Sequence, residues 1–209
     1  MFSSEYIETK QVGRFTVKIW QDEDPWNPRE WDNLTKMIFF HGRYILGDKH
    51  DYKSQDYNGW DEMEKQLIED FKPVVIYKVR MYDHSGIGLS LSADRYPFNC
   101  PWDSGWIGFI LISREDALKA YSAKRLTEKI KDRCERILVS EFNTYNEYLQ
   151  GEVYGYSVRD GDGDIVDSCS GFYGDEGYKE CLADGIRLAE YEEARRSHEE
   201  EVRAEVTTA

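Results

Sequence analysis

The segment from residue 82 to residue 86 contains, side by side, the three residue types of nucleophilic catalysis: Asp83, His84 and Ser85. Loops at strand ends often carry catalytic groups. A Ser-His-Asp triad, however, is assembled from distant parts of a chain, and three consecutive side chains do not reach one another in the required geometry. An Asp-His-Ser-Gly sequence is also an ordinary turn between two strands. We therefore treat these residues as one wall of a candidate pocket and assign no catalytic residue.

The loop over residues 100–106, Cys-Pro-Trp-Asp-Ser-Gly-Trp, is the other wall of this candidate pocket. Trp side chains dominate binding hot spots, so we expect Cys100, Trp102 and Asp103 to contribute contacts. Simple packing of the two tryptophans beneath a loop is the alternative. A nucleophilic role for Cys100 would require a matched His base, which the spacing does not supply.

Metal and cofactor sites are not predicted. The cysteines form no CxxC pair, which excludes a zinc ribbon. His41, His50 and His84 show no helical i, i+4 spacing. The Asp-Gly-Asp-Gly-Asp run over residues 160–164 resembles the start of a calcium loop, but positions 6 and 12 of such a loop would be Ile165 and Gly171 in place of Gly and Glu. A hairpin turn fits this run better.

Negative charge is concentrated in the C-terminal third. Residues 140–209 contain 18 acidic and 6 basic residues, whereas residues 1–139 contain 23 and 21. Carboxylates spaced along a helix and a hairpin can imitate DNA phosphates and attract the basic groove of a nucleic-acid enzyme. A solvated helix face is the alternative. The candidate partner-binding surface consists of Asp160, Asp162, Asp164, Asp167, Asp175, Glu176, Asp184, Glu190, Glu192, Glu193, Glu199, Glu200 and Glu201.

The composition also limits partners and location. The isoelectric point near 4.8 argues against direct binding of nucleic acid. The longest apolar run, near Ile107–Ile112, is too short to span a bilayer. The first nine residues lack the features of a secretory signal. We expect a cytoplasmic protein with reduced thiols, and the sequence leaves homo-oligomerisation open.

Hydrophobic periodicity predicts an α+β fold. We expect one domain over residues 1–190, with a mostly antiparallel mixed sheet and about four helices, followed by an acidic helical extension or frayed tail over 191–209. The clearest helices are a long amphipathic one over 125–150 and a C-terminal one from about 176. Expected strands cover residues 15–19, 36–40, 73–82, 86–92 and 106–112, with a hairpin over 152–170.

Several distinctive segments resemble a family of proteins from tailed phages and mobile elements that has no assigned activity. The segments that carry the resemblance are residues 32–48, 82–87, 100–109, 145–156 and 167–174. The resemblance implies genomic context only. Small acidic proteins of phages often counter host defence, as anti-CRISPR and antirestriction proteins do. The leading hypothesis is thus a non-enzymatic inhibitor that binds a basic, nucleic-acid-handling host protein, and the alternative is an enzyme or small-ligand binder that uses the candidate pocket.

Overall fold

The computed structural model describes residues 6–84, 86–94 and 103–208, which form two compact units. Unit 1 combines the residues up to Trp26 with those from Gly151 onward, and unit 2 is the continuous stretch Asn27–Gln150. No linker rich in Gly, Ser or Pro marks either junction. The expectation of a single domain over residues 1–190 stays a prediction.

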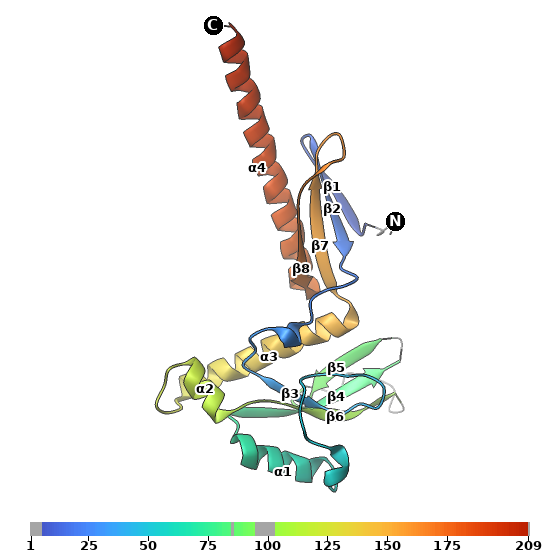
Figure 1. Ribbon diagram of the computed structural model, residues 1–209, viewed down its shortest axis with the longest axis vertical. Helices are drawn as coiled ribbons and strands as arrows, with labels where there is room; N and C mark the ends of the chain where they lie inside the picture. The colour runs from blue at the N-terminus through green and yellow to red at the C-terminus, as the bar shows by residue number, and fades with distance from the viewer. Residues whose placement is uncertain (1–5, 85, 95–102, 209) are drawn as a thin grey trace. The chain divides into compact units, whose positions relative to one another are not determined.

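Unit 1 is an antiparallel sheet covered on one face by a long helix (Figure 1). Alternation in β2 directs Phe15, Val17 and Ile19 toward the helix, where all three are fully buried. The turn between β7 and β8 is the predicted Asp-Gly-Asp-Gly-Asp hairpin. The strand order is β1-β2-β7-β8, and the elements are β1 (Glu8–Val12), β2 (Phe15–Gln21), β7 (Val153–Arg159), β8 (Ile165–Tyr173) and α4 (Gly174–Thr208).

Small residues let α4 approach the sheet closely. Gly177, Cys181, Gly185 and Ala189 recur at helical spacing and are buried. A Cβ atom added at Gly185 would lie 2.7 Å from Cγ1 of Val17, and one added at Gly177 would lie 2.8 Å from backbone carbon of the preceding strand. These distances are shorter than van der Waals contact, so the helix–sheet distance depends on the absence of side chains here.

Two β-turns hold the middle of α4 against the sheet. In the β1–β2 turn, Arg14 donates from its backbone N–H to Glu193 (2.7 Å) and from its guanidinium to both Glu193 and Glu200. In the β7–β8 turn, Asp160 accepts a hydrogen bond from Arg196 at 3.2 Å. We call these contacts the turn clamp. Residues 198–207 are the last residues of α4 whose side chains are described, and they are exposed.

Unit 2 is a second four-stranded antiparallel sheet with helices on both faces (Figure 1). Helix α3 buries Cys134, Leu138 and Phe142 against one face, while α1 buries Met63 and Leu67 against the other. The strand order is β3-β6-β4-β5, and the elements are η1 (Pro28–Glu30), β3 (Lys36–Phe39), η2 (Ser54–Asp56), α1 (Trp60–Phe71), β4 (Val75–Asp83), β5 (Ile87–Leu91), β6 (Ser104–Ile112), α2 (Arg114–Ala120) and α3 (Glu128–Gln150).

The predicted α+β class, the antiparallel strands and the two long helices are confirmed. Helix α3 begins at Glu128, and α4 begins at Gly174, each within a few residues of the expected start. One difference concerns a larger feature. The strands divide between two sheets instead of one. Of the two alternatives for the end of the chain, the helical extension is present, because α4 continues as one helix to Thr208.

Candidate functional site

The acidity belongs to one structural unit. Unit 1 contains 21 acidic and 9 basic residues, a net charge of −12, whereas unit 2 contains 20 and 18, a net charge of −2. The bounds of unit 1 include both ends of the chain, so the C-terminal excess seen in the sequence is a property of a folded body. The local bases are already counted in this total, so ion pairs inside the unit leave its net charge unchanged.

More than half of the predicted acidic residues are engaged by neighbouring cations. Arg195 pairs with two glutamates of its own helix, and Lys179 and Arg187 each pair with an acid three residues earlier. Exposed pairs of this kind contribute little stability. With the turn clamp included, the paired residues are Asp160, Glu176, Asp184, Glu192, Glu193, Glu199 and Glu200.

Three of these carboxylates have a structural role in the turn clamp. The backbone N–H of Arg14 and then its guanidinium lower the pKa of Glu193, although desolvation acts the other way. The hydrogen bond from Arg14 also lowers the pKa of Glu200. Desolvation would raise the pKa of Asp160, but hydrogen bonds from Arg196 and from two backbone N–H groups of its own turn outweigh it and lower this pKa. Each group is therefore stabilised in its charged form by the fold.

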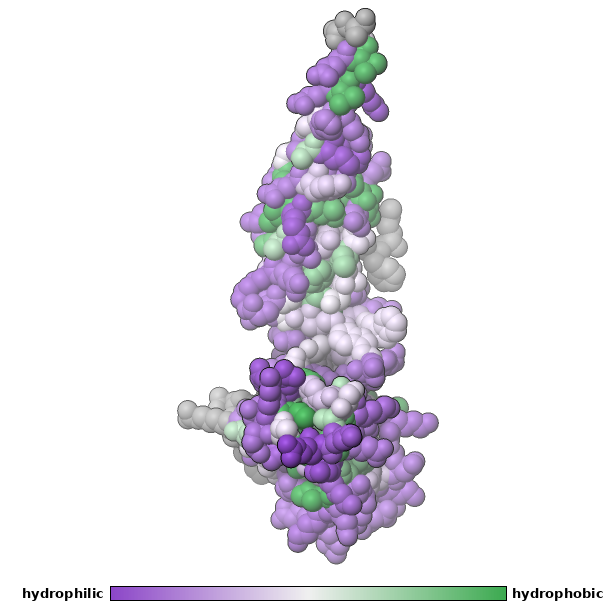
Figure 2. All heavy atoms as spheres, turned by 90° about the vertical axis from the view of Figure 1, so that its left-hand side faces the viewer, coloured by the Kyte–Doolittle hydropathy of each residue, from purple (hydrophilic) through white to green (hydrophobic). Residues whose placement is uncertain are grey.

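The remaining predicted acidic residues are exposed and form no ion pair within the described part of the chain. They lie on the β7–β8 hairpin and along α4, and they are Asp162, Asp164, Asp167, Asp175, Glu190 and Glu201. Figure 2 shows that the face of unit 1 turned to the viewer is mostly hydrophilic with some apolar positions. Three large apolar side chains of α4, Tyr191, Val202 and Val206, are exposed. The hairpin and α4 thus expose unpaired carboxylates together with a few apolar side chains.

The structure brings together the described residues of the other candidate site. The backbone N–H of Asp83 donates to the carbonyl of Asp103 at 2.9 Å, and Nδ1 of His84 lies 3.4 Å from a carboxylate oxygen of Asp103. Arg43 forms an ion pair with Asp83 beside a groove of about 340 Å³ whose lining includes Trp106. The expected proximity of turn and loop is present, while Ser85, Cys100 and Trp102 lie outside the described residues.

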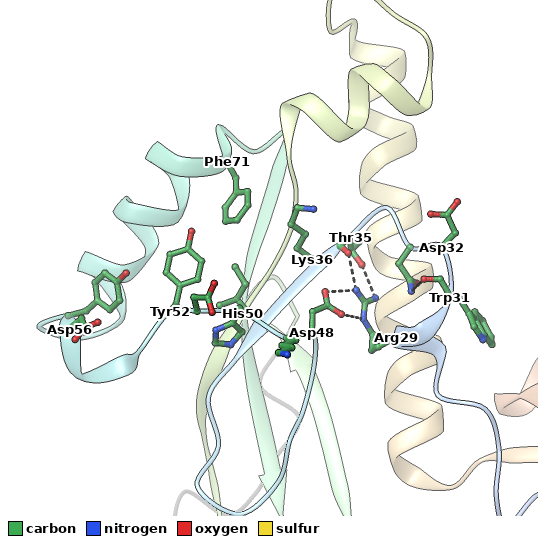
Figure 3. Close-up of a pocket in the computed structure, with 15 residues that line it drawn as sticks. Arg29, Trp31, Asp32, Thr35, Lys36, Asp48, His50, Tyr52, Asp56 and Phe71 are labelled. Carbon is green, nitrogen blue, oxygen red and sulfur yellow. Dashed lines mark hydrogen bonds and ion pairs between the residues drawn. The ribbon is translucent and has the colours of Figure 1, made fainter.

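A second groove, of about 690 Å³, lies in unit 2 beside β3 and was not predicted (Figure 3). Arg29, whose side chain is 4% exposed, forms its right-hand part. The Nε and Nη2 atoms of Arg29 donate to the two carboxylate oxygens of Asp48, each at 2.8 Å. Arg29 donates two further hydrogen bonds to Thr35. Glu141 accepts hydrogen bonds from the backbone N–H groups of Leu34 and Thr35. This bidentate, buried arrangement fixes the loop before β3 and uses four of the five N–H donors of Arg29.

The central part of the same groove contains His50, next to Tyr52 in Figure 3. The Nε2 atom of His50 lies 3.0 Å from the carbonyl oxygen of Phe39. A carbonyl only accepts, so Nε2 carries the proton, and in the neutral ring Nδ1 is then an acceptor. This Nδ1 is buried and has no hydrogen-bond partner among the residues that the structure describes. A small ligand with an N–H or O–H group could satisfy it, with the rings of Tyr52 and Phe71 as apolar surroundings.

The sequence could not indicate this groove. Its polar network joins residues 29, 35, 48 and 141, which no local spacing connects. The one usable signal was the closeness in the sequence of His50 to Asp48, Asp51 and Tyr52. Within the described residues, no group of three or more His, Cys, Asp or Glu side chains is arranged to hold a metal ion.

Searches against protein-family models, curated proteins and solved structures found no match to this chain. The resemblance to a phage and mobile-element family therefore stays a prediction. None of the helices among the described residues is long and apolar enough to cross a membrane.

Proposed function

We propose that the protein is an accessory inhibitor that binds a basic, nucleic-acid-handling host protein through unit 1. The observation that carries this proposal is the net charge of −12 on a unit that holds less than half of the chain. A field of this sign attracts cationic clefts and accelerates their association. The resemblance to proteins of phages and mobile elements, which often counter host defence, points to the same class of target.

The charge density is that of a partial DNA mimic. Helix α4 has 35 residues and is therefore about 50 Å long. Spread over that length, the net charge amounts to roughly one negative charge per 4 Å. Duplex DNA has one per about 1.7 Å and a single strand one per about 3.4 Å. Unit 1 thus presents less than half the density of a duplex. Because its exposed charges are screened by salt, we expect its binding to weaken as the salt concentration rises.

The test is capture of a basic host protein by the full chain at about 50 mM and about 500 mM salt. We expect capture at low salt, loss at high salt, and inhibition of the captured protein's nucleic-acid activity. A triple charge reversal at free carboxylates, Asp162→Lys, Glu190→Lys and Glu201→Lys, should abolish capture. The control reverses three exposed acids of unit 2, Asp51, Glu69 and Glu115, and has the same total charge. Equal capture by the two variants, or capture that is insensitive to salt, would contradict the proposal.

A second candidate function, small-ligand binding, rests on the contact between His84 and Asp103 beside the 340 Å³ groove. An imidazole and a carboxylate in contact can orient a polar ligand or a water molecule. A ligand that binds there raises the thermal midpoint of the folded protein. In a thermal-shift screen, that rise should disappear in the double variant His84→Ala, Asp103→Ala. A hit that stabilises both proteins equally binds elsewhere and excludes this site.

A further inference from the structure

Unit 2 carries a cluster of cations that contrasts with the acidity of the chain. Residues 119–136, at the end of α2 and the start of α3, contain seven basic and three acidic residues. Lys131 pairs with Glu128. The other cations are exposed and form no ion pair among the described residues: Lys119, Lys124, Arg125, Lys129, Arg133 and Arg136. Unpaired cations at this density along one stretch of chain favour an anionic ligand.

Part of this cluster lines a groove. Lys129, Arg133 and Arg136 follow one another at helical spacing along α3, so they share one side of the helix. Two adjoining hollows, of about 330 Å³ and 800 Å³, share Tyr121, which follows α2, and Ile137 and Ser140 of α3. The charged residues that line the smaller hollow are Arg133 and Arg136, while Tyr121 and Ile137 supply apolar surface. The larger hollow adds Lys36 and Lys119 together with three acids. Of these, Asp116 pairs with Lys36, Glu141 accepts the backbone N–H groups of Leu34 and Thr35, and Asp32 is exposed. In Figure 2 this side of unit 2 shows strongly hydrophilic side chains around a small apolar patch.

The aromatic ring decides which anion fits best. The guanidinium of Arg133 lies 5.8 Å from the ring centroid of Tyr121, so a cation and an aromatic face lie together in the groove. Grooves that bind single strands combine cations for the phosphates with an aromatic ring on which an unstacked base lies. A duplex keeps its bases stacked and offers nothing to Tyr121. An acidic peptide would use the cations alone.

The acidity of the whole chain does not exclude such a ligand. At physiological ionic strength, charges are screened over about 8 Å. The side chains around a groove, more than the total charge, therefore decide what binds there. We propose that the groove between α2 and α3 binds the phosphate backbone of a short single-stranded nucleic acid, with one base on Tyr121. This inference is independent of the proposed role of unit 1.

The test uses the full chain and a fluorescent oligothymidine of about 12 nucleotides, with binding followed by anisotropy between about 50 mM and 200 mM salt. We expect the variant Arg133→Glu, Arg136→Glu to weaken binding by about tenfold or more. The slope of log affinity against log salt should also fall by about 1.4, because two phosphate contacts are lost. Tyr121→Ala should weaken binding by about fivefold or more and leave the salt slope unchanged.

The matched control is Lys53→Glu, Lys65→Glu, which changes the total charge equally at exposed positions outside the groove. It should stay within about twofold of the wild type. Equal losses in the two double variants, absence of wild-type binding at low salt, or equal binding of a duplex would overturn the proposal. A further result would also overturn the proposal: the chain self-associates, the groove variant abolishes this self-association, and oligothymidine does not affect it. The groove would then be occupied by the acidic unit of a second copy.

Discussion

Arg29 is the residue on which the fold before β3 depends most. Its buried guanidinium is balanced by Asp48 and faces Glu141, 3.8 Å away. Removing the cation leaves two carboxylates without compensation, and breaking such a pair typically costs several kcal/mol. We expect Arg29→Met to lower the free energy of unfolding by about 3 kcal/mol in denaturant titration.

The control for this prediction is Arg43→Met, which removes an arginine from the ion pair with Asp83. The side chain of Arg43 is 70% exposed, so this pair is screened by solvent. We expect a loss of less than about 1 kcal/mol. Similar losses in the two variants would mean that the network around Arg29 is no more than a surface ion pair.

At the scale of elements, the packing of α4 depends on its small residues. Gly185→Leu would place a branched side chain where even a Cβ atom lies 2.7 Å from Val17. The helix must move from the sheet or the side chain must adopt a strained rotamer, and overpacking of this kind costs about 1–3 kcal/mol. We expect a loss in this range by thermal unfolding. Ala183→Leu, at an exposed position two residues earlier, should change stability by less than about 0.5 kcal/mol.

The turn clamp predicts a dependence on pH. The pKa values of Glu193 and Glu200 are lower in the folded protein, because Arg14 binds their charged forms. Groups with lowered pKa values stabilise the fold fully above their unfolded pKa, near 4.3, and lose this effect as the pH falls through the folded values. Stability should therefore drop below about pH 4.5. In Arg14→Gln, unfolding monitored from pH 6 to pH 3 should show a smaller drop.

Arg187→Gln provides the control for the turn clamp, because it removes the same charge from an exposed i, i+3 pair of α4. Its stability should follow the wild-type dependence on pH. If Arg14→Gln also follows that dependence, the carboxylates of the clamp do not have lowered pKa values.

At the scale of the whole molecule, the sequence predicts elements well and their assembly poorly. Local periodicity identified α3 because Cys134, Leu138 and Phe142 recur every four residues and are buried. It could not show that Val17 pairs with Val158, because no local signal connects residues so far apart in the chain. That pairing closes unit 1 from both chain ends and separates the strands into two sheets. The composition identified the acidic residues, but only the fold shows which of them pair with arginines.

This closure leads to a prediction about independent folding. Unit 2 contains all strands of its sheet in the continuous stretch Asn27–Gln150, with buried clusters on both faces of that sheet. A body with its own core can fold alone. We expect a fragment of residues 27–150 to unfold cooperatively in denaturant and to show the circular dichroism of a mixed fold. The fragment 151–209 should not fold, because β7 would lack β2 as its partner and the buried side chains of Phe15, Val17 and Ile19 would be missing.

The fragments also separate the two proposed activities. The first has a net charge of only −2 and retains the groove between α2 and α3, so it should bind oligothymidine yet fail to capture a basic protein. An unfolded 27–150 fragment would mean that the two units form a single cooperative domain.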